Sequence, residues 1–212
     1  FTITGNTIES DTDNLAGTIE RGDKAEGIKF TINEGVQNGT TNLTAVIENN
    51  DIQTRIGDGS EFAVNELAAD GVVFDANITI NNNRIVQTND NPVGSENKDP
   101  RDLIKATFGE DGEGSITTGT FTITNNTVTS AAGAGDAFNY ESLSTSTSNI
   151  FKFKIEGNNF TAADDKDLKI IVPTGYLSIS APDGTTNFDA YLDSINTDAE
   201  TEISGSPEVF RF

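Results

Sequence analysis

A six-residue pattern recurs five times along the chain and constrains its fold more than any other feature. Each copy has Ile first, Gly or Asn third, Asn fourth and an apolar residue sixth: ITGNTI (3–8), IENNDI (47–52), INNNRI (80–85), ITNNTV (123–128) and IEGNNF (155–160). The two apolar side chains can both point inward only if the chain bends sharply between them. Gly and Asn tolerate the left-handed conformation that such a bend requires. Each copy therefore predicts a strand, a bend and a second strand.

The spacing of the copies indicates stacked repeats with loops of unequal length. Successive fourth-position asparagines are 44, 33, 43 and 32 residues apart. Between the bends lies a second recurring element, a Gly or an acidic residue followed by a short apolar strand, at residues 27–30, 71–74, 102–105 and 136–139. Each repeat then holds three strands. Repeats of this kind bury a continuous core by stacking on one another.

This order of strands and bends resembles the right-handed parallel β-helix repeat of pectate-lyase-like proteins, phage tailspikes and bacterial surface adhesins, including autotransporter passengers. The resemblance covers residues 1 to about 163. It implies an all-β fold, a triangular solenoid of about five coils with three parallel sheets and an internal ladder of asparagine amides at the bend. The ladder would consist of Asn6, Asn50, Asn83, Asn126 and Asn158. The open alternative is a set of unconnected turn asparagines in an Asn-rich chain.

Residues 164–212 depart from the repeat and predict either capping strands or the start of an adjoining region. Residues 168–180 alternate in polarity and turn at Pro-Thr-Gly, which predicts a pair of strands. Four apolar side chains are candidates to cover the last coil, or alternatively to form a partner-binding patch: Tyr176, Phe188, Tyr191 and Leu192. Phe1 already lies beside a repeat copy, so we expect a chain cut from a longer precursor or one that has lost its cap.

The longest connections are the segments in which we expect a specific binding surface, because loops tolerate variation that a packed core does not. They are residues 55–70, 88–101 and 130–149. Within the first of them, residues 61–69 predict one or two helical turns.

The net charge of −21 restricts the partners of the chain. It disfavours nucleic acid and anionic membranes, and no Lys/Arg cluster offers a path for phosphates. No apolar segment long enough to span a membrane is present, so we expect no direct membrane insertion.

We expect the protein to require no cofactor. Ca²⁺ is a candidate ion because acidic loops supply hard oxygen ligands; the candidate residues are Asp11, Asp13, Asp111, Glu113, Asp164, Asp165 and Asp167. Solvated loops are the alternative for each cluster, since none follows EF-hand spacing.

Catalysis is not predicted. The chain contains no His and no Cys, which removes the usual bases and thiol nucleophiles. Glycosidases of the resembled fold carry an Asn-Thr-Asp motif, an Asp-Asp pair and a Gly-His-Gly. Here residues 196–198 and 164–165 match the first two in the wrong order, and the third is missing.

The composition is consistent with a narrow secreted β protein, since only 34% of residues are hydrophobic and Cys, Met and Trp are absent. We therefore predict a non-catalytic extracellular or cell-surface protein, an adhesin or rigid stalk that binds a glycan or another surface protein through its loops. One alternative is a polysaccharide-active lyase or glycosidase. The other is a structural filament or tail-fibre subunit that self-associates through the end of the solenoid.

Overall fold

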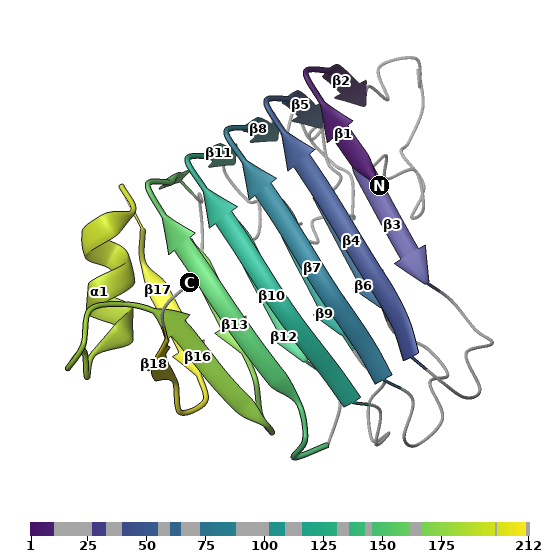
Figure 1. Cartoon of the computed structure of the whole chain (residues 1–212). Coiled ribbons are helices and arrows are strands. Elements are labelled where there is room, and N and C mark those ends of the chain that lie inside the picture. Colours follow the sequence, from purple (N-terminus) through teal and green to yellow (C-terminus); the bar gives the residue numbers. More distant parts are fainter. Residues whose placement is uncertain are drawn as a thin grey trace, which may run out of the picture.

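The structure is a computed structural model that describes residues 1–10, 27–32, 40–54, 60–64, 73–87, 102–108, 116–130, 136–142, 146–161, 167–197 and 199–210. In this part of the chain the secondary structure is eighteen strands and one short helix, and all of the strands that pair do so in parallel (Figure 1). The predicted all-β class with parallel sheets is confirmed.

The strands form three sheets. The seven-stranded sheet contains β1 (Thr2–Thr4), β4 (Thr40–Glu48), β7 (Val73–Asn81), β10 (Ile116–Thr124), β13 (Ile150–Glu156), β16 (Tyr176–Ser180) and β18 (Glu208–Phe210). The five-stranded sheet contains β2 (Thr7–Ser10), β5 (Asp51–Thr54), β8 (Arg84–Gln87), β11 (Thr127–Ser130) and β14 (Asn159–Thr161). The six-stranded sheet contains β3 (Ile28–Ile32), β6 (Ser60–Val64), β9 (Ile104–Phe108), β12 (Phe138–Ser142), β15 (Leu168–Ile171) and β17 (Thr201–Ser204).

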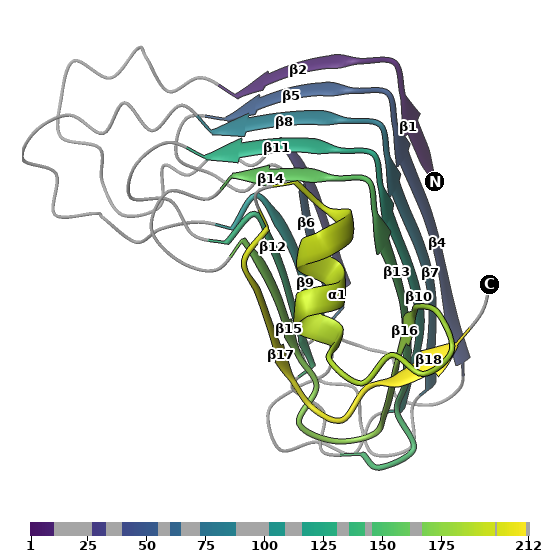
Figure 2. The same ribbon diagram turned by 90° about the vertical axis from the view of Figure 1, so that its left-hand side faces the viewer.

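Each passage of the chain through the sheets, which we call a circuit, lies on the previous one in register, and Figure 2 views this stack along its length. The first Ile of each repeat copy pairs with its counterpart in the next circuit, as Ile47 does with Ile80 and Ile80 with Ile123. The sixth residue does the same in the five-stranded sheet, where Ile52 pairs with Ile85. Because side chains alternate between the faces of a strand, this register sends both apolar positions of every copy to the same interior.

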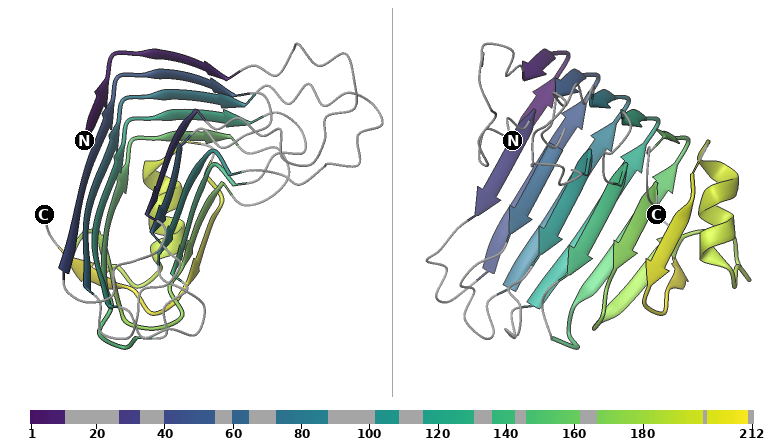
Figure 3. Two further views of the ribbon diagram at one scale, coloured as in Figure 1. Left: turned by 90° about the vertical axis from the view of Figure 1, so that its right-hand side faces the viewer. Right: turned by 180° about the vertical axis from the view of Figure 1, so that it is seen from behind.

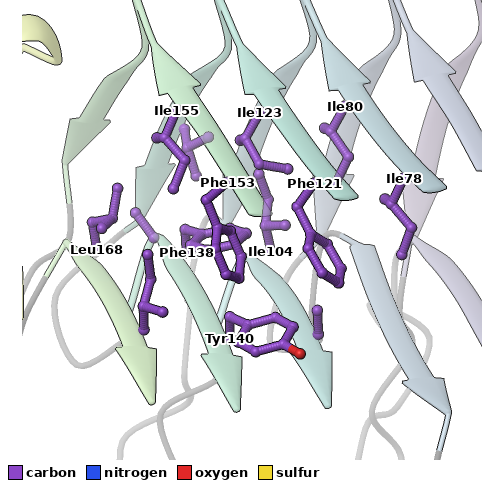
Figure 4. Packing of buried hydrophobic residues seen from close by; sticks show 14 of the residues in the cluster. Ile78, Ile80, Ile104, Phe121, Ile123, Phe138, Tyr140, Phe153, Ile155 and Leu168 are labelled. Atoms are coloured by element: carbon purple, nitrogen blue, oxygen red, sulfur yellow. The ribbon is translucent and has the colours of Figure 1, made fainter. Parts of the chain in front are cut away.

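The interior is a single apolar column enclosed by the three sheets (Figures 3 and 4). It contains an aromatic cluster. Phe121 and Phe153 stack with ring centroids 4.9 Å apart, and Tyr140 reaches in from the six-stranded sheet to meet both rings edge-on at 4.9 Å. Gly119 leaves room for this cluster, because a Cβ atom there would collide with the Phe121 ring. Burial raises the pKa of Tyr140 well above its usual value, so the phenol is neutral.

The left-handed residue of each bend is the third of the repeat copy, directly before the fourth-position asparagine. Its φ angle is +68° at Gly5, +57° at Asn49, +52° at Asn82, +57° at Asn125 and +67° at Gly157. These are the positions at which the sequence alternates between Gly and Asn, the residue types that pay least for this conformation. The fourth-position Asn is thereby free to turn its amide inward.

Substitutions at Asn82 test this conformation. We expect Asn82→Val to destabilise the fold by about 1–2 kcal/mol, because a β-branched residue is strained at positive φ. Asn82→Gly should change stability by only a few tenths of a kcal/mol. Urea unfolding followed by circular dichroism measures both. Asn77→Val is the control and should be close to neutral, because Asn77 is exposed and has an extended backbone on β7, the strand that precedes the bend. Equal losses at both positions would contradict the explanation.

Two sequence predictions about residues 61–74 are wrong. The helical turns expected at 61–69 are replaced over residues 61–64 by β6, which pairs with β3 on one side and β9 on the other. Residues 65–69 lie outside the described part. Likewise, residues 71–74 were expected to hold a copy of the second recurring element, whose other copies are strands of the six-stranded sheet. Val73 and Phe74 instead begin β7 in the seven-stranded sheet. Hydrogen bonding to two neighbouring strands outweighs the weak local preference of the segment.

The predicted pairing within residues 168–180 is also wrong, because β15 and β16 belong to different sheets. β15 continues the six-stranded sheet beside β12, and β16 continues the seven-stranded sheet beside β13. The turn at Pro173–Gly175 therefore carries the chain between sheets instead of folding it back. Gly175 has a φ angle of +103° and packs against Asn149, where a Cβ atom would lie 2.6 Å from the Asn149 Cβ atom.

Helix α1 (Phe188–Ile195) covers the C-terminal end of the stack, as both Figure 1 and Figure 2 show. Phe188 and Leu192 are buried and Tyr191 is partly buried against the core. These three are therefore covering residues, whereas Tyr176 is 42% exposed and takes no part in the cap. The sequence signals for the helix are its N-cap, Asn187, whose side chain accepts from the Ala190 amide, and the apolar pair Phe188 and Leu192 one turn apart.

Candidate functional site

The asparagines at the bends form one continuous hydrogen-bonded row. Asn83 is typical: its backbone N–H and its Nδ2 both donate to Asn126 Oδ1 at 3.0 Å, and its Nδ2 also donates to the Ile47 carbonyl at 2.9 Å. Each amide thus binds the next circuit and ties down a strand of the previous one. The structure brings together all five residues named from the sequence, which are Asn6, Asn50, Asn83, Asn126 and Asn158.

A sixth asparagine, which the sequence analysis did not find, ends the row. Asn158 donates from its backbone N–H and its Nδ2 to Asn196 Oδ1 at 3.0 and 2.9 Å. Asn196 is the C-cap of α1, and its Nδ2 donates to the Leu192 carbonyl at 2.9 Å. The ladder therefore runs from the first repeat copy into the covering helix. Asn196 does not follow the repeat pattern, because a helix instead of a strand precedes it. The sequence feature that it shares with the ladder is an Asn-Thr pair, as at Asn6 and Thr7.

The ladder has a direction. From Asn6 to Asn158, each asparagine donates to the Oδ1 atom of the next member towards the C-terminus. The first member, Asn6, accepts at its own Oδ1 from none of the described residues. Asn6 is exposed, whereas Asn50 and the later members are buried. The two ends of the stack are thus chemically different: one carries an open acceptor, and the other is closed by α1.

An exposed polar edge runs beside the ladder. Asn82 Nδ2 donates to Asn49 Oδ1 at 2.7 Å, and Thr124 Oγ1 donates to Asn81 Oδ1 at 2.9 Å. Arg84, the basic residue next to a bend, pairs with Asp51 at 2.6 Å on the adjacent strand, with about half of each side chain exposed. Pairs this exposed contribute less than about 1 kcal/mol to stability, so this edge stabilises the fold only weakly.

A second row of side chains lies at the start of the six-stranded-sheet strands and consists of carboxylates. Asp102 accepts from the Asp136 backbone N–H at 3.1 Å and from Asn139 Nδ2 at 2.9 Å, and Asp167 accepts from the Glu200 N–H at 2.9 Å. The acidic residue seen before these strands in the sequence thus binds the backbone of the next circuit. Asp167, a Ca²⁺ candidate, is buried in this role.

The remaining Ca²⁺ candidates lie outside the described residues: Asp11, Asp13, Asp111, Glu113, Asp164 and Asp165. Residues 88–101, one of the expected binding loops, also lie outside them. Within the described ranges no three acidic side chains gather as a metal site would require. Asp167 shows how a carboxylate in an acidic segment can serve backbone bonding instead.

Among the side chains that the structure describes, those on the outer face of the seven-stranded sheet are mostly polar, with an apolar spot near its C-terminal end. There Tyr176 and Ile150 are 42% and 38% exposed. The Tyr176 hydroxyl donates to Glu208 Oε2 at 2.7 Å. This hydrogen bond and the Glu208 charge raise the pKa of Tyr176, so the phenol stays neutral well into the alkaline range.

Comparison with known proteins gives no assignment. No family model, no curated protein sequence and no solved structure matches the chain. Among the described residues, no helix combines the length and the apolar character needed to cross a membrane.

Proposed function

We propose that the chain is a right-handed parallel β-helix of about five coils that acts outside the cell as a rigid, non-catalytic adhesive stalk. In this proposal residues 1–163 form the coils, and residues 164–212 continue the sheets with β15 to β18 and close the stack with α1. The hand follows from a general rule, since crossovers between parallel strands of one sheet are right-handed in about 98% of cases. The stacked register of all three sheets supports the helical path.

One observation carries the stalk function. The ladder joins every circuit to the next from Asn6 to Asn196 through two-donor hydrogen bonds, which are buried from Asn50 onwards. Hydrogen bonds between side-chain amides cost much free energy to break inside an apolar column, because a lost partner leaves a buried polar atom unsatisfied. A stack bonded in this way resists bending and local opening between circuits, which is the property a stalk needs.

The adhesive function draws on the surface. The acidic charge keeps an extended β structure soluble and repels nucleic acid, which leaves glycans and other surface proteins as partners. The flat outer strands offer hydroxyl, amide and charged groups in regular rows, and the bend edge adds the exposed amides of Asn82 and Asn125. No cofactor is needed for such binding, and Ca²⁺ bound by the acidic loops would be an accessory.

We expect the purified chain to be retained on immobilised polysaccharides without cutting them. Neutral and acidic polysaccharides are tested with and without Ca²⁺, and retained protein and newly released reducing ends are measured together. A parallel series in about 0.5 M salt removes binding that is only electrostatic. Released ends would overturn the proposal in favour of a lyase or glycosidase. If the chain binds none of the polysaccharides, the proposal that it adheres to glycans is wrong.

Self-association through the N-terminal end is the second candidate, and a specific observation favours it. Ile3 and Ile8 are only partly buried, whereas their counterparts Ile47 and Ile52 are fully buried. Among the described residues this end also has unpaired strand edges at β1 and β2, which invite further strands. A mass that rises with concentration in sedimentation equilibrium would favour the filament or tail-fibre alternative over an isolated stalk.

A further inference from the structure

The apolar spot on the seven-stranded sheet is formed by two side chains that the register places together. Ile150 of β13 pairs with Tyr176 of β16, and neighbouring strands lie about 4.8 Å apart. Their successors Phe151 and Leu177 are buried, so Ile150 and Tyr176 both point outward. Phe1 is the other large apolar residue exposed in the described ranges, and it lies on the first circuit, at the opposite end of the stack.

Tyr176 is held firmly in this position. Its backbone N–H donates to the Asn149 carbonyl at 2.7 Å, and its hydroxyl donates to Glu208 Oε2 at 2.7 Å. The tight turn at Gly175 packs on the buried Asn149. An aromatic ring fixed at both ends loses little conformational entropy when a ligand covers it.

Residues of opposite charge occupy the two strands next to β16, one row along the sheet from Tyr176. Lys152 pairs with Ser178, and Ser178 pairs with Glu208, so the ammonium and the carboxylate belong to one row of the sheet, next to the row of Ile150 and Tyr176. Thr120 extends the same row on the other side of Lys152. An exposed ring with a donor on one side and an acceptor on the other matches a sugar, which has apolar C–H faces and hydroxyls around its rim.

We propose that Tyr176 and Ile150 form a platform for a neutral glycan, with one sugar ring lying on Tyr176 and its hydroxyls bonded to Glu208 and Lys152. The proposal rests on the adhesive function proposed above and names its ligand and its site. Neutral sugars are favoured over acidic ones because the platform contains Glu208 and the whole chain carries a charge of −21. A protein partner fits poorly, since two side chains cover far less than the roughly 800 Å² per partner of a stable interface.

Affinity electrophoresis in native gels containing a dissolved β-glucan, galactomannan or xylan tests the platform. We expect at least one of these neutral polysaccharides to retard the wild-type chain, and Tyr176→Ala to weaken this binding about tenfold or more. Tyr176→Phe keeps the ring and should bind within about threefold of wild type. Asn42→Ala is the matched control: Asn42 is exposed in the same row of the sheet as Tyr176 but four strands away, and its loss should leave retardation unchanged.

The outcomes separate the site from the function. Loss of binding in Tyr176→Ala together with retention in Tyr176→Phe and Asn42→Ala supports the platform. If Tyr176→Ala binds as well as wild type, the platform is overturned while the adhesive function stands. The platform also falls if the wild-type chain binds acidic polysaccharides alone. A chain that binds no polysaccharide overturns the platform together with the glycan-binding part of the adhesive function.

Discussion

Phe153→Ala is expected to lower the free energy of unfolding by about 4 kcal/mol, a typical loss when a fully buried aromatic ring is truncated. Phe153 is fully buried, stacks on Phe121 at 4.9 Å and meets Tyr140 edge-on at the same distance. The truncation loses the transfer free energy of the ring and also leaves a cavity. That cavity cannot collapse easily, because its walls are strands held in register by their neighbours on both sides.

Urea unfolding followed by circular dichroism and by tyrosine fluorescence measures this loss, and the absence of Trp makes the tyrosine signal readable. Ile150→Ala is the control on the same strand: Ile150 points outward and its truncation should cost well under about 1 kcal/mol. Phe153→Leu should fall between the two. Equal losses for Phe153→Ala and Ile150→Ala would show that the aromatic cluster is not the centre of the core.

The bend repeats were predictable because they combine two independent constraints at a fixed spacing. An inward apolar residue must lie on each side of the bend, and a residue of positive φ must lie between them, which restricts the third position to residues such as Gly5 or Asn82. The asparagine that follows has no such backbone constraint. Its presence in every copy therefore points to a side-chain role, which the hydrogen bonds of Asn83 and Asn126 show directly.

β6 and the path of β15 and β16 were not predictable in the same way. A parallel strand takes its hydrogen bonds from circuits some thirty or more residues away, so five residues such as Ser60–Val64 carry little of their own stabilisation in their sequence. The turn before Tyr176 has the Pro and Gly of a hairpin connection. Only the stacked register shows that β16 pairs with β13 instead of with β15.

The candidate platform also could not be predicted from the sequence. Tyr176 and Leu177 are adjacent, and one of them must point outward, but a shift of one residue in register would exchange their faces. The sequence therefore grouped Tyr176 with Phe188, Tyr191 and Leu192, as residues that either cover the last coil or form a partner-binding patch. Its pairing with Ile150 and its hydrogen bond to Glu208 come from strands 26 to 32 residues away in the chain.

Asn126→Ala is expected to cost about 4 kcal/mol, comparable to the loss of a core aromatic ring. The substitution removes the acceptor of the Asn83 backbone N–H and Nδ2, both at 3.0 Å, and the donor to the Ile80 carbonyl at 2.9 Å and to Asn158 Oδ1 at 3.0 Å. Asn83 and the Ile80 carbonyl are then left without these partners in a buried region. Each unsatisfied buried group costs about 1–3 kcal/mol.

Asn6→Ala is the matched control, since it removes the same side chain from the same ladder. Asn6 is exposed and donates to Asn50 Oδ1 and to the Thr4 carbonyl, so water can replace what it loses and the cost should stay below about 1 kcal/mol. Thermal and urea unfolding of the two variants measure the difference. A large gap between them places the stabilisation in the burial of the ladder and in its continuity across circuits. Similar costs at both positions would instead make each asparagine a local turn residue, and the argument for a stalk held rigid by the ladder would fail.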